Sequence, residues 1–274
     1  MLDFLKNKKD KYSTDDMVLQ KTEDGRVVLI EHANPVGDIF LPDELAITEI
    51  GDEAFKGSLF KKCKITSIQS NTVKIVGNNS FKGCKKLKNV SFPQAETIGQ
   101  GAFKKCSDLE TVDFPKVQRI GKDAFKKCGN LENVTFPEVK TIGPSAFTPG
   151  ILTDSNLESA SFPMVETIGK EAFLFCEKLV DISCPNVKTL ENGAFNGCKK
   201  LESASFPMVE TIGEMSLANC KSLKNVSFPL VETIEKATFI NCDSMISVSF
   251  PKVKTIGIDA FWNCESYLMC LFLW

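Results

Sequence analysis

A dipeptide made of a branched aliphatic residue and, in most copies, glycine recurs along the chain at a nearly constant interval. Ile98-Gly99 is followed 22 residues later by Ile120-Gly121, and most other intervals have the same length. The aliphatic positions of the ten copies are Ile50, Val76, Ile98, Ile120, Ile142, Ile168, Leu190, Ile212, Ile234 and Ile256. A repeat that runs through the middle of a chain predicts one stacked array instead of two separate domains.

Within one repeat, the apolar side chains fall into two groups. The first has the spacing of one face of a short helical turn, and in residues 98–119 it consists of Ala102, Phe103, Cys106 and Leu109. The second has the L-x-x-L-x-L spacing of a leucine-rich-repeat strand, and it consists of Leu109, Val112 and Phe114. Pro115 has no N–H group and is suited to ending that strand. Val117 and Ile120 then begin a second extended piece.

These groups predict a repeat solenoid of the leucine-rich-repeat type, with a parallel β-strand per coil, short helical or 3-10 turns, and about ten coils of mostly 22 residues. No single repeat has enough apolar residues for a core, so the coils must stack to form one. We expect residues 47–264 to form the solenoid. Residues 1–46 are expected to form an N-terminal leader and a capping hairpin around Asp24-Gly25. Within the solenoid, Phe114 is expected to point inward, so that Phe114→Ser should loosen or unfold it.

The glycine of the recurring dipeptide is often a residue with positive φ in other proteins. Here Glu191 and Glu235 occupy the same position, so a left-handed backbone cannot be obligatory there. A column of threonines precedes the aliphatic position, and we expect it to pack between coils and not to form an ice-binding array: Thr97, Thr141, Thr167, Thr189, Thr211, Thr233 and Thr255.

Three places depart from the period. Two intervals are four residues longer than the rest and predict loops at 57–62 and 148–154, because insertions in solenoids map to loops. Residues 265–274 form an apolar, degenerate C-terminal tail. This tail folds over the last coil, docks on a partner or marks a truncated gene end, and we favour the last alternative. An open last coil carries a risk of self-association through the C-terminal edge.

The consensus I-G-x-x-A-F-x-x-C-x-x-L-x-x-V-x-F-P resembles the BspA-like, or treponemal-type, leucine-rich repeats. It is nearly intact in residues 76–93, 98–115, 120–137 and 168–185. Such proteins are known from bacteria and protists of mucosal surfaces. The resemblance implies surface display, adhesion and binding of host or matrix proteins, and thus a non-enzymatic module with a protein or glycan ligand.

Cysteine is frequent in this chain, with 11 residues, whereas histidine occurs once, as His32. Eight cysteines form a ladder at one position of the repeat: Cys84, Cys106, Cys128, Cys176, Cys198, Cys220, Cys242 and Cys264. The ladder is either a metal or redox array or a column of small buried hydrophobic residues, and we favour the second interpretation because the position lies on the apolar stripe. We therefore expect reduced thiols, no metal, no cofactor and no catalytic site. Among the remaining cysteines, Cys270 is expected to be the most exposed.

The outward positions of the predicted strands form two columns of small polar residues. They are Asn89, Ser91, Thr111, Asp113, Asn133, Thr135, Ser159, Ser161, Asp181, Ser183, Ser203, Ser205, Asn225, Ser227, Ser247 and Ser249. In leucine-rich repeats this sheet lines the concave binding surface. The columns are either a ligand groove or a solvated face that lets the coils stack, and both alternatives remain open. Because the columns contain no Trp, Tyr or Arg, weak, multivalent or glycan contacts fit them better than a tight protein site.

A basic stripe is confined to the N-terminal half of the array, formed by Lys82, Lys104, Lys105, Lys126 and Lys127. It is either a site for an anionic glycan, protein or phosphate surface or a solvated edge, and we favour the solvated edge. Specific nucleic-acid binding is not expected, because the net charge is −2 and no aromatic residue interleaves with the lysines.

Localisation is the point on which composition and resemblance differ. No apolar segment of signal-peptide length follows Met1, and the longest apolar run, residues 267–274, is too short to span a bilayer. The sequence by itself therefore favours a cytoplasmic protein without a membrane span, whereas the resemblance implies the cell surface. Two functions remain: a surface or secreted adhesion-type protein, and an intracellular scaffold that binds a cytosolic protein partner.

Overall fold

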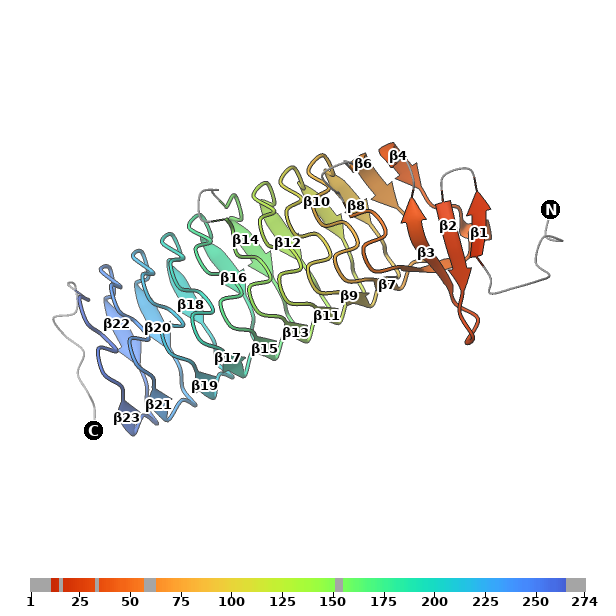
Figure 1. The fold of residues 1–274 in the computed structure, drawn as a ribbon. Helices are drawn as coiled ribbons and strands as arrows, with labels where there is room; N and C mark the ends of the chain where they lie inside the picture. Colours follow the sequence, from red (N-terminus) through yellow and green to blue (C-terminus); the bar gives the residue numbers. More distant parts are fainter. Residues whose placement is uncertain (1–10, 15–16, 33–34, 57–62, 151–154, 265–274) are drawn as a thin grey trace.

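The chain folds as an elongated solenoid (Figure 1). The computed structural model describes residues 11–14, 17–32, 35–56, 63–150 and 155–264. In this part of the chain, successive repeats form stacked coils, and each coil adds a short strand to each of two opposite sides. The prediction of a leucine-rich-repeat solenoid is confirmed. The predicted loops at 57–62 and at the end of 148–154, and the C-terminal tail with Cys270, lie outside the described residues.

An antiparallel hairpin begins the described chain. It is formed by β2 (Met17–Lys21) and β3 (Val27–His32), with β1 (Lys11–Thr14) paired to the outer edge of β2. Asp24-Gly25 lies in the connecting turn, where Gly25 has a φ of 84°, and the predicted hairpin is confirmed. β3 continues into the solenoid by parallel pairing with β5 (Ile47–Ile50), after the 3-10 helix η1 (Asp43–Leu45).

One side of the solenoid, called the strand face below, carries the longer strand of each coil. The strands are β4 (Val36–Phe40), β6 (Lys64–Gln69), β8 (Asn89–Ser91), β10 (Thr111–Asp113), β12 (Asn133–Thr135), β14 (Ser159–Ser161), β16 (Asp181–Ser183), β18 (Ser203–Ser205), β20 (Asn225–Ser227) and β22 (Ser247–Ser249). Equivalent residues pair in register, as in Thr111 with Asn89. This side is not one sheet: β4-β6-β8-β10, β12-β14-β16 and β18-β20-β22 are separate.

The opposite side, called the Thr-Ile face, carries two-residue strands after β5. They are β7 (Ile75–Val76), β9 (Thr97–Ile98), β11 (Arg119–Ile120), β13 (Thr141–Ile142), β15 (Thr167–Ile168), β17 (Thr189–Leu190), β19 (Thr211–Ile212), β21 (Thr233–Ile234) and β23 (Thr255–Ile256). They form a continuous sheet from β1 to β19, while β21 and β23 pair separately. Thr141 lies beside Thr167, and Thr167 beside Thr189, so the threonines are aligned from coil to coil.

The segment between the two faces is a series of turns rather than a helix, although its apolar spacing predicts helical or 3-10 character. Alternate N–H groups bond within the coil, as from Lys104 to Gly101 O at 3.0 Å. The others bond to the next coil, as from Phe103 to Ala124 O at 2.8 Å. The N–H groups that bond to the next coil are therefore not available for the hydrogen bonds of a helix. The third residue after each aliphatic position also has positive φ, which ends right-handed helical structure.

Most positive-φ positions are occupied by residues other than glycine, and Met215, with a φ of 54°, is one of them. Met215→Gly is expected to raise the free energy of unfolding by about 0.5–1 kcal/mol, because glycine avoids a left-handed cost of about 1–2 kcal/mol but adds chain entropy to the unfolded state. Thermal denaturation measures the effect. Met208 is equally exposed but has no positive φ, so stabilisation by Met208→Gly as well would contradict the conformational explanation.

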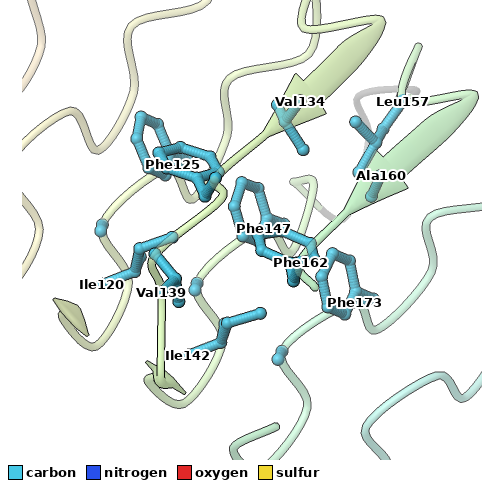
Figure 2. Close-up of a cluster of buried hydrophobic side chains, with 14 of the residues drawn as sticks. Ile120, Phe125, Val134, Val139, Ile142, Phe147, Leu157, Ala160, Phe162 and Phe173 are labelled. Carbon is cyan, nitrogen blue, oxygen red and sulfur yellow. The ribbon is translucent and has the colours of Figure 1, made fainter. Parts of the chain in front are cut away.

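Two columns of phenylalanine rings fill the core. In the first, seven rings from Phe55 to Phe195 stack with centroids 4.8–5.3 Å apart, which matches the spacing of strands in a sheet. In the second, Phe114 lies 6.0 Å from Phe92 and 6.3 Å from Phe136. Figure 2 shows Phe125, Phe147 and Phe162 of the two columns among the aliphatic residues between the faces. Phe114 is 1% exposed, so its predicted inward position is confirmed.

The glycine of the recurring dipeptide serves close approach between coils. Gly121 has no positive φ, and a Cβ placed on it would lie 2.6 Å from the backbone carbon of Gly99 in the preceding coil. The prediction that this position needs no left-handed backbone is confirmed. Glutamate takes this position in two coils: at Glu191 the sheet of the Thr-Ile face is continuous, whereas at Glu235 it is interrupted between β19 and β21.

Candidate functional site

The strand face presents the predicted polar columns to solvent. In each short strand the middle residue points inward and its two neighbours point outward, as in β12, where Val134 is buried and Asn133 and Thr135 are exposed. Each predicted pair occupies the two ends of a strand from β8 to β22, and the register aligns the pairs within each of the sheets. Their predicted placement is thus confirmed, whereas their role in binding stays a prediction.

Side chains on this face form hydrogen bonds along the columns. Thr111 Oγ1 donates to Asn89 Oδ1 at 2.6 Å, and Ser159 Oγ donates to Asn133 Oδ1 at 2.6 Å. Ser247 Oγ donates to Asn225 Oδ1 at 2.9 Å. Short side chains bonded between coils lose little conformational entropy when a ligand arrives, which favours binding by a preorganised surface.

At least two concavities lie on the strand face of the described chain. The larger encloses about 720 Å³ and lies between β10 and β12, where it is lined by Glu110, Thr111, Val112, Asp113, Phe114, Pro115, Asn130, Glu132, Asn133, Thr135 and Pro137. The smaller encloses about 280 Å³ over β6, β8 and β10. The carboxylates of Glu110 and Glu132 are absent from the predicted columns because they precede the strands. Their position in the repeat also holds Lys88 and Val180, so no repeated signal identifies them.

Two of the five lysines of the basic stripe pair with one carboxylate, while no ion pair joins Lys82, Lys105 or Lys127 within the described chain. Lys104 Nζ lies 2.8 Å from Asp123 Oδ2, and Lys126 Nζ lies 3.1 Å from Asp123 Oδ1. Lys105 is exposed, while Lys82 and Lys127 are half-buried. One carboxylate therefore neutralises part of the stripe, and the choice between an anion site and a solvated edge stays a prediction.

Asp123 makes the stability of this edge depend on pH. Burial by itself raises the pKa of Asp123, but the hydrogen bonds from Lys104 and Lys126 outweigh it and hold the pKa below its ordinary value. Asp123→Asn is expected to lower the free energy of unfolding at pH 7 by less than about 1 kcal/mol. The difference should vanish as the pH falls from about 3.9, the ordinary aspartate pKa, through the lower folded value, because the lowered pKa stabilises only the ionised form.

Urea denaturation at neutral and acidic pH measures this dependence. Asp259 has the same place in its repeat and a similar φ, but it is exposed and makes no ion pair within the described chain. Asp259→Asn is therefore the matched control, and an equal pH dependence in both variants would contradict the role of the lysine pair.

The cysteines of the ladder are buried, apart from the half-buried Cys264, and their sulfur atoms lie against backbone carbonyls of the preceding coil. Cys106 Sγ donates to Phe81 O at 3.1 Å, and Cys128 Sγ donates to Phe103 O at 3.1 Å. Desolvation by burial raises the pKa of Cys128 and Cys220 to about 12. Such thiols are protonated at neutral pH and are poor nucleophiles and metal ligands. The described residues contain no group of His, Cys, Asp and Glu able to hold a metal ion.

One pair of cysteines contradicts the expectation of reduced thiols. Cys63 and Cys84 form a disulfide with their Cα atoms 4.9 Å apart. The first long interval precedes Val76 and brings Cys63 onto the coil next to that of Cys84. Cysteines on adjacent coils are within the Cα separation that a disulfide requires. The other described cysteines are free.

The parallel strands, stacked coils and phenylalanine columns define the leucine-rich-repeat class of solenoid. Comparison with protein families identifies the type: the BspA type leucine rich repeat region matches residues 48–154 and 148–267. The chain belongs to this family. No curated protein matches the chain.

Solved structures with a similar fold include bacterial leucine-rich-repeat proteins. The Leucine Rich Repeat protein of T. pallidum is 25% identical, with a TM-score of 0.60, over 78% of this chain and 91% of that one. A leucine rich cell surface protein of Faecalibacterium prausnitzii is 20% identical, with a TM-score of 0.40, over 89% of this chain and 96% of that one. Among the described residues, no helix has the length and apolarity needed to cross a membrane.

Proposed function

We propose that the chain is a non-enzymatic binding module that uses the strand face to hold a protein or glycan ligand, in the manner of a surface adhesion-type protein. The observation that carries the proposal is the pair of exposed small polar columns, held by a rigid ladder of coils. Membership of a family of repeat modules supports a binding role. Many small contacts repeated along a rod favour multivalent binding, in which weak sites add in avidity.

The binding role is tested with bulky substitutions on each face. Ser205→Arg and Ser227→Arg place a long side chain on the strand face, while Thr211→Arg and Thr233→Arg place the same side chain on the Thr-Ile face; all four residues are exposed. The purified chain is added to an array of immobilised matrix proteins and glycans. We expect the strand-face variants to lose binding and the Thr-Ile variants to retain it. Equal effects on both faces, or no ligand on the array, would contradict the proposal.

The alternative function is an intracellular scaffold that binds a cytosolic partner through the same face. The buried ladder thiols favour neither alternative, and the Cys63–Cys84 disulfide favours an oxidising compartment. Protease treatment of intact source cells, followed by detection of the chain, separates the two. Removal of the chain while cytosolic proteins survive supports the surface role, whereas survival until lysis supports the scaffold.

A further inference from the structure

The strand face of the described chain is interrupted at two places, between β10 and β12 and between β16 and β18, and the first of these interruptions carries the larger concavity described above. Between neighbouring coils, Glu110 N–H bonds to Lys88 O at 2.8 Å, and Glu158 N–H bonds to Glu132 O at 2.7 Å. Among the described residues, the equivalent bond from Glu132 N–H to Glu110 O is missing, and β10 and β12 are not paired. The same two coils remain joined by Phe103 N–H to Ala124 O at 2.8 Å. The opening is therefore confined to the strand face.

Side chains of β10 and β12, the two strands that border the opening, form hydrogen bonds to the coils on its far sides. On β10, Thr111 donates to Asn89, and Asp113 accepts from Ser91 at 2.8 Å, both residues of the preceding coil. On β12, Asn133 accepts from Ser159 of the following coil. β10 is thus stabilised by β8, and β12 by β14. The edges of β10 and β12 that face each other remain without a partner strand in the described chain.

Val112, at the base of the opening, is also more accessible than the equivalent residues of the two neighbouring strands. Val112 is half-buried, whereas Val90 and Val134 on the neighbouring strands are 2% and 3% exposed. The opening encloses about 720 Å³, within the range of roughly 300–1,000 Å³ that is usual for ligand clefts. It therefore combines unpaired backbone groups, an apolar floor and enough volume for a short segment of chain.

The acidic residues that line the opening favour a ligand with positive charge. Three lining residues, Glu110, Asp113 and Glu132, carry carboxylates, and none of the lining residues is Lys, Arg or His. Lys88 pairs with Glu110 at 3.1 Å from the outer side, while Glu132 makes no ion pair within the described chain. The aliphatic stems of lysine or arginine would cover Val112 while their cationic ends reach the carboxylates.

We propose that the opening between β10 and β12 binds an extended peptide segment that carries lysine or arginine side chains. The inference rests on the proposed function, since it assigns a ligand class to part of the strand face. The peptide lies on the strand face over the opening, and its basic side chains bond to Glu110, Asp113 and Glu132.

The test uses a fluorescently labelled octapeptide of alternating lysine and valine, with a glutamate and valine peptide as its partner. Anisotropy is measured with the wild-type chain and with the triple variant Glu110→Gln, Asp113→Asn, Glu132→Gln. The control triple variant, Glu166→Gln, Glu210→Gln, Glu232→Gln, removes equal charge from exposed residues beside the Thr-Ile face. We expect the lysine peptide to bind the wild-type chain and the control variant. Binding to the opening variant should be at least about tenfold weaker.

Several results would overturn the inference: no saturable binding at about 1 mM peptide, equal losses in both triple variants, or equal binding of the glutamate peptide. If the triple variant fails to fold, as judged by its circular dichroism, Glu132→Gln alone is used, because that side chain supports no ion pair. If the lysine peptide does not bind but the chain still binds a ligand on the matrix and glycan array, the inference is wrong and the proposed function stands. If neither the peptide assay nor the array shows binding, both the inference and the proposed function are wrong.

Discussion

Phe114→Ser is expected to lower the free energy of unfolding by roughly 3–5 kcal/mol, which is the usual cost of removing a buried phenylalanine. The ring of Phe114 contacts both columns, with centroids 6.0 Å from Phe92, 5.8 Å from Phe103 and 6.3 Å from Phe136. Serine leaves a cavity and places a hydroxyl where the surrounding groups are apolar, so the transfer cost and the cost of a buried polar group act together.

Urea denaturation, followed by circular dichroism, measures the loss. Lys116→Ser is the matched control, because Lys116 lies two residues away, is exposed, and bonds only to Gln94 by its side chain. We expect the control to change the free energy of unfolding by less than about 0.5 kcal/mol. If Phe114→Ser unfolds at the same urea concentration as the wild-type chain, the two-column description of the core is wrong.

The variant also tests how far the coils act together. A solenoid is stabilised by contacts between neighbouring coils, so a defect at Phe114 weakens the coils on both sides of it. A second transition in the denaturation curve would show that the array unfolds in parts, for which the strand face offers boundaries between β10 and β12 and between β16 and β18. A single transition would show that the Thr-Ile face and the turn ladder keep the array cooperative.

Much of the fold is predictable because each structural role recurs at one position of the repeat. Val112 and Phe114 alternate with polar residues, and the same alternation returns in the next coils, so the inward and outward positions follow from the sequence. The register follows as well, because shifting one coil against the next would move every apolar residue off its column. The polar columns of the strand face were predictable for the same reason.

The turns were less predictable because apolar spacing does not distinguish a helical turn from a chain of short turns. The deciding feature is the left-handed backbone at residues such as Asp123 and Met215, which have no shared chemistry that marks it. Hydrogen bonds between coils, which replace those of a helix, depend on the distance between coils and not on residue type.

The opening at β10 and the disulfide are local departures from the repeat. Thr111 and Asn133 fit the polar columns as well as their counterparts do, yet their strands are not paired with each other. Cys63 is displaced by a longer interval, whose path cannot be derived from its sequence. A periodic sequence predicts what the coils share, and the candidate binding site lies at one of the two places in the described chain where the strands of the strand face are not paired.

Gly121→Val is expected to lower the free energy of unfolding by about 1–3 kcal/mol through overpacking. A Cβ at Gly121 meets the backbone carbon of Gly99 at 2.6 Å and the backbone nitrogen of Gln100 at 2.7 Å. Neither atom belongs to a flexible side chain, so the two coils must separate. That separation also weakens the bond from Gly121 N–H to Ile98 O, which is 2.8 Å long.

Glu235→Val is the matched control, because a side chain already occupies the same position there and the Thr-Ile sheet is already interrupted. We expect it to cost less than about 0.5 kcal/mol, since the exposed Glu235 side chain makes no hydrogen bond within the described chain. Thermal denaturation of both variants, with hydrogen exchange of the amides of β11 and β13, measures the difference. Equal stability of the two variants would mean that glycine is not needed for close approach. A larger loss in Gly121→Val, with faster exchange in β11, means that this glycine sets the distance between coils.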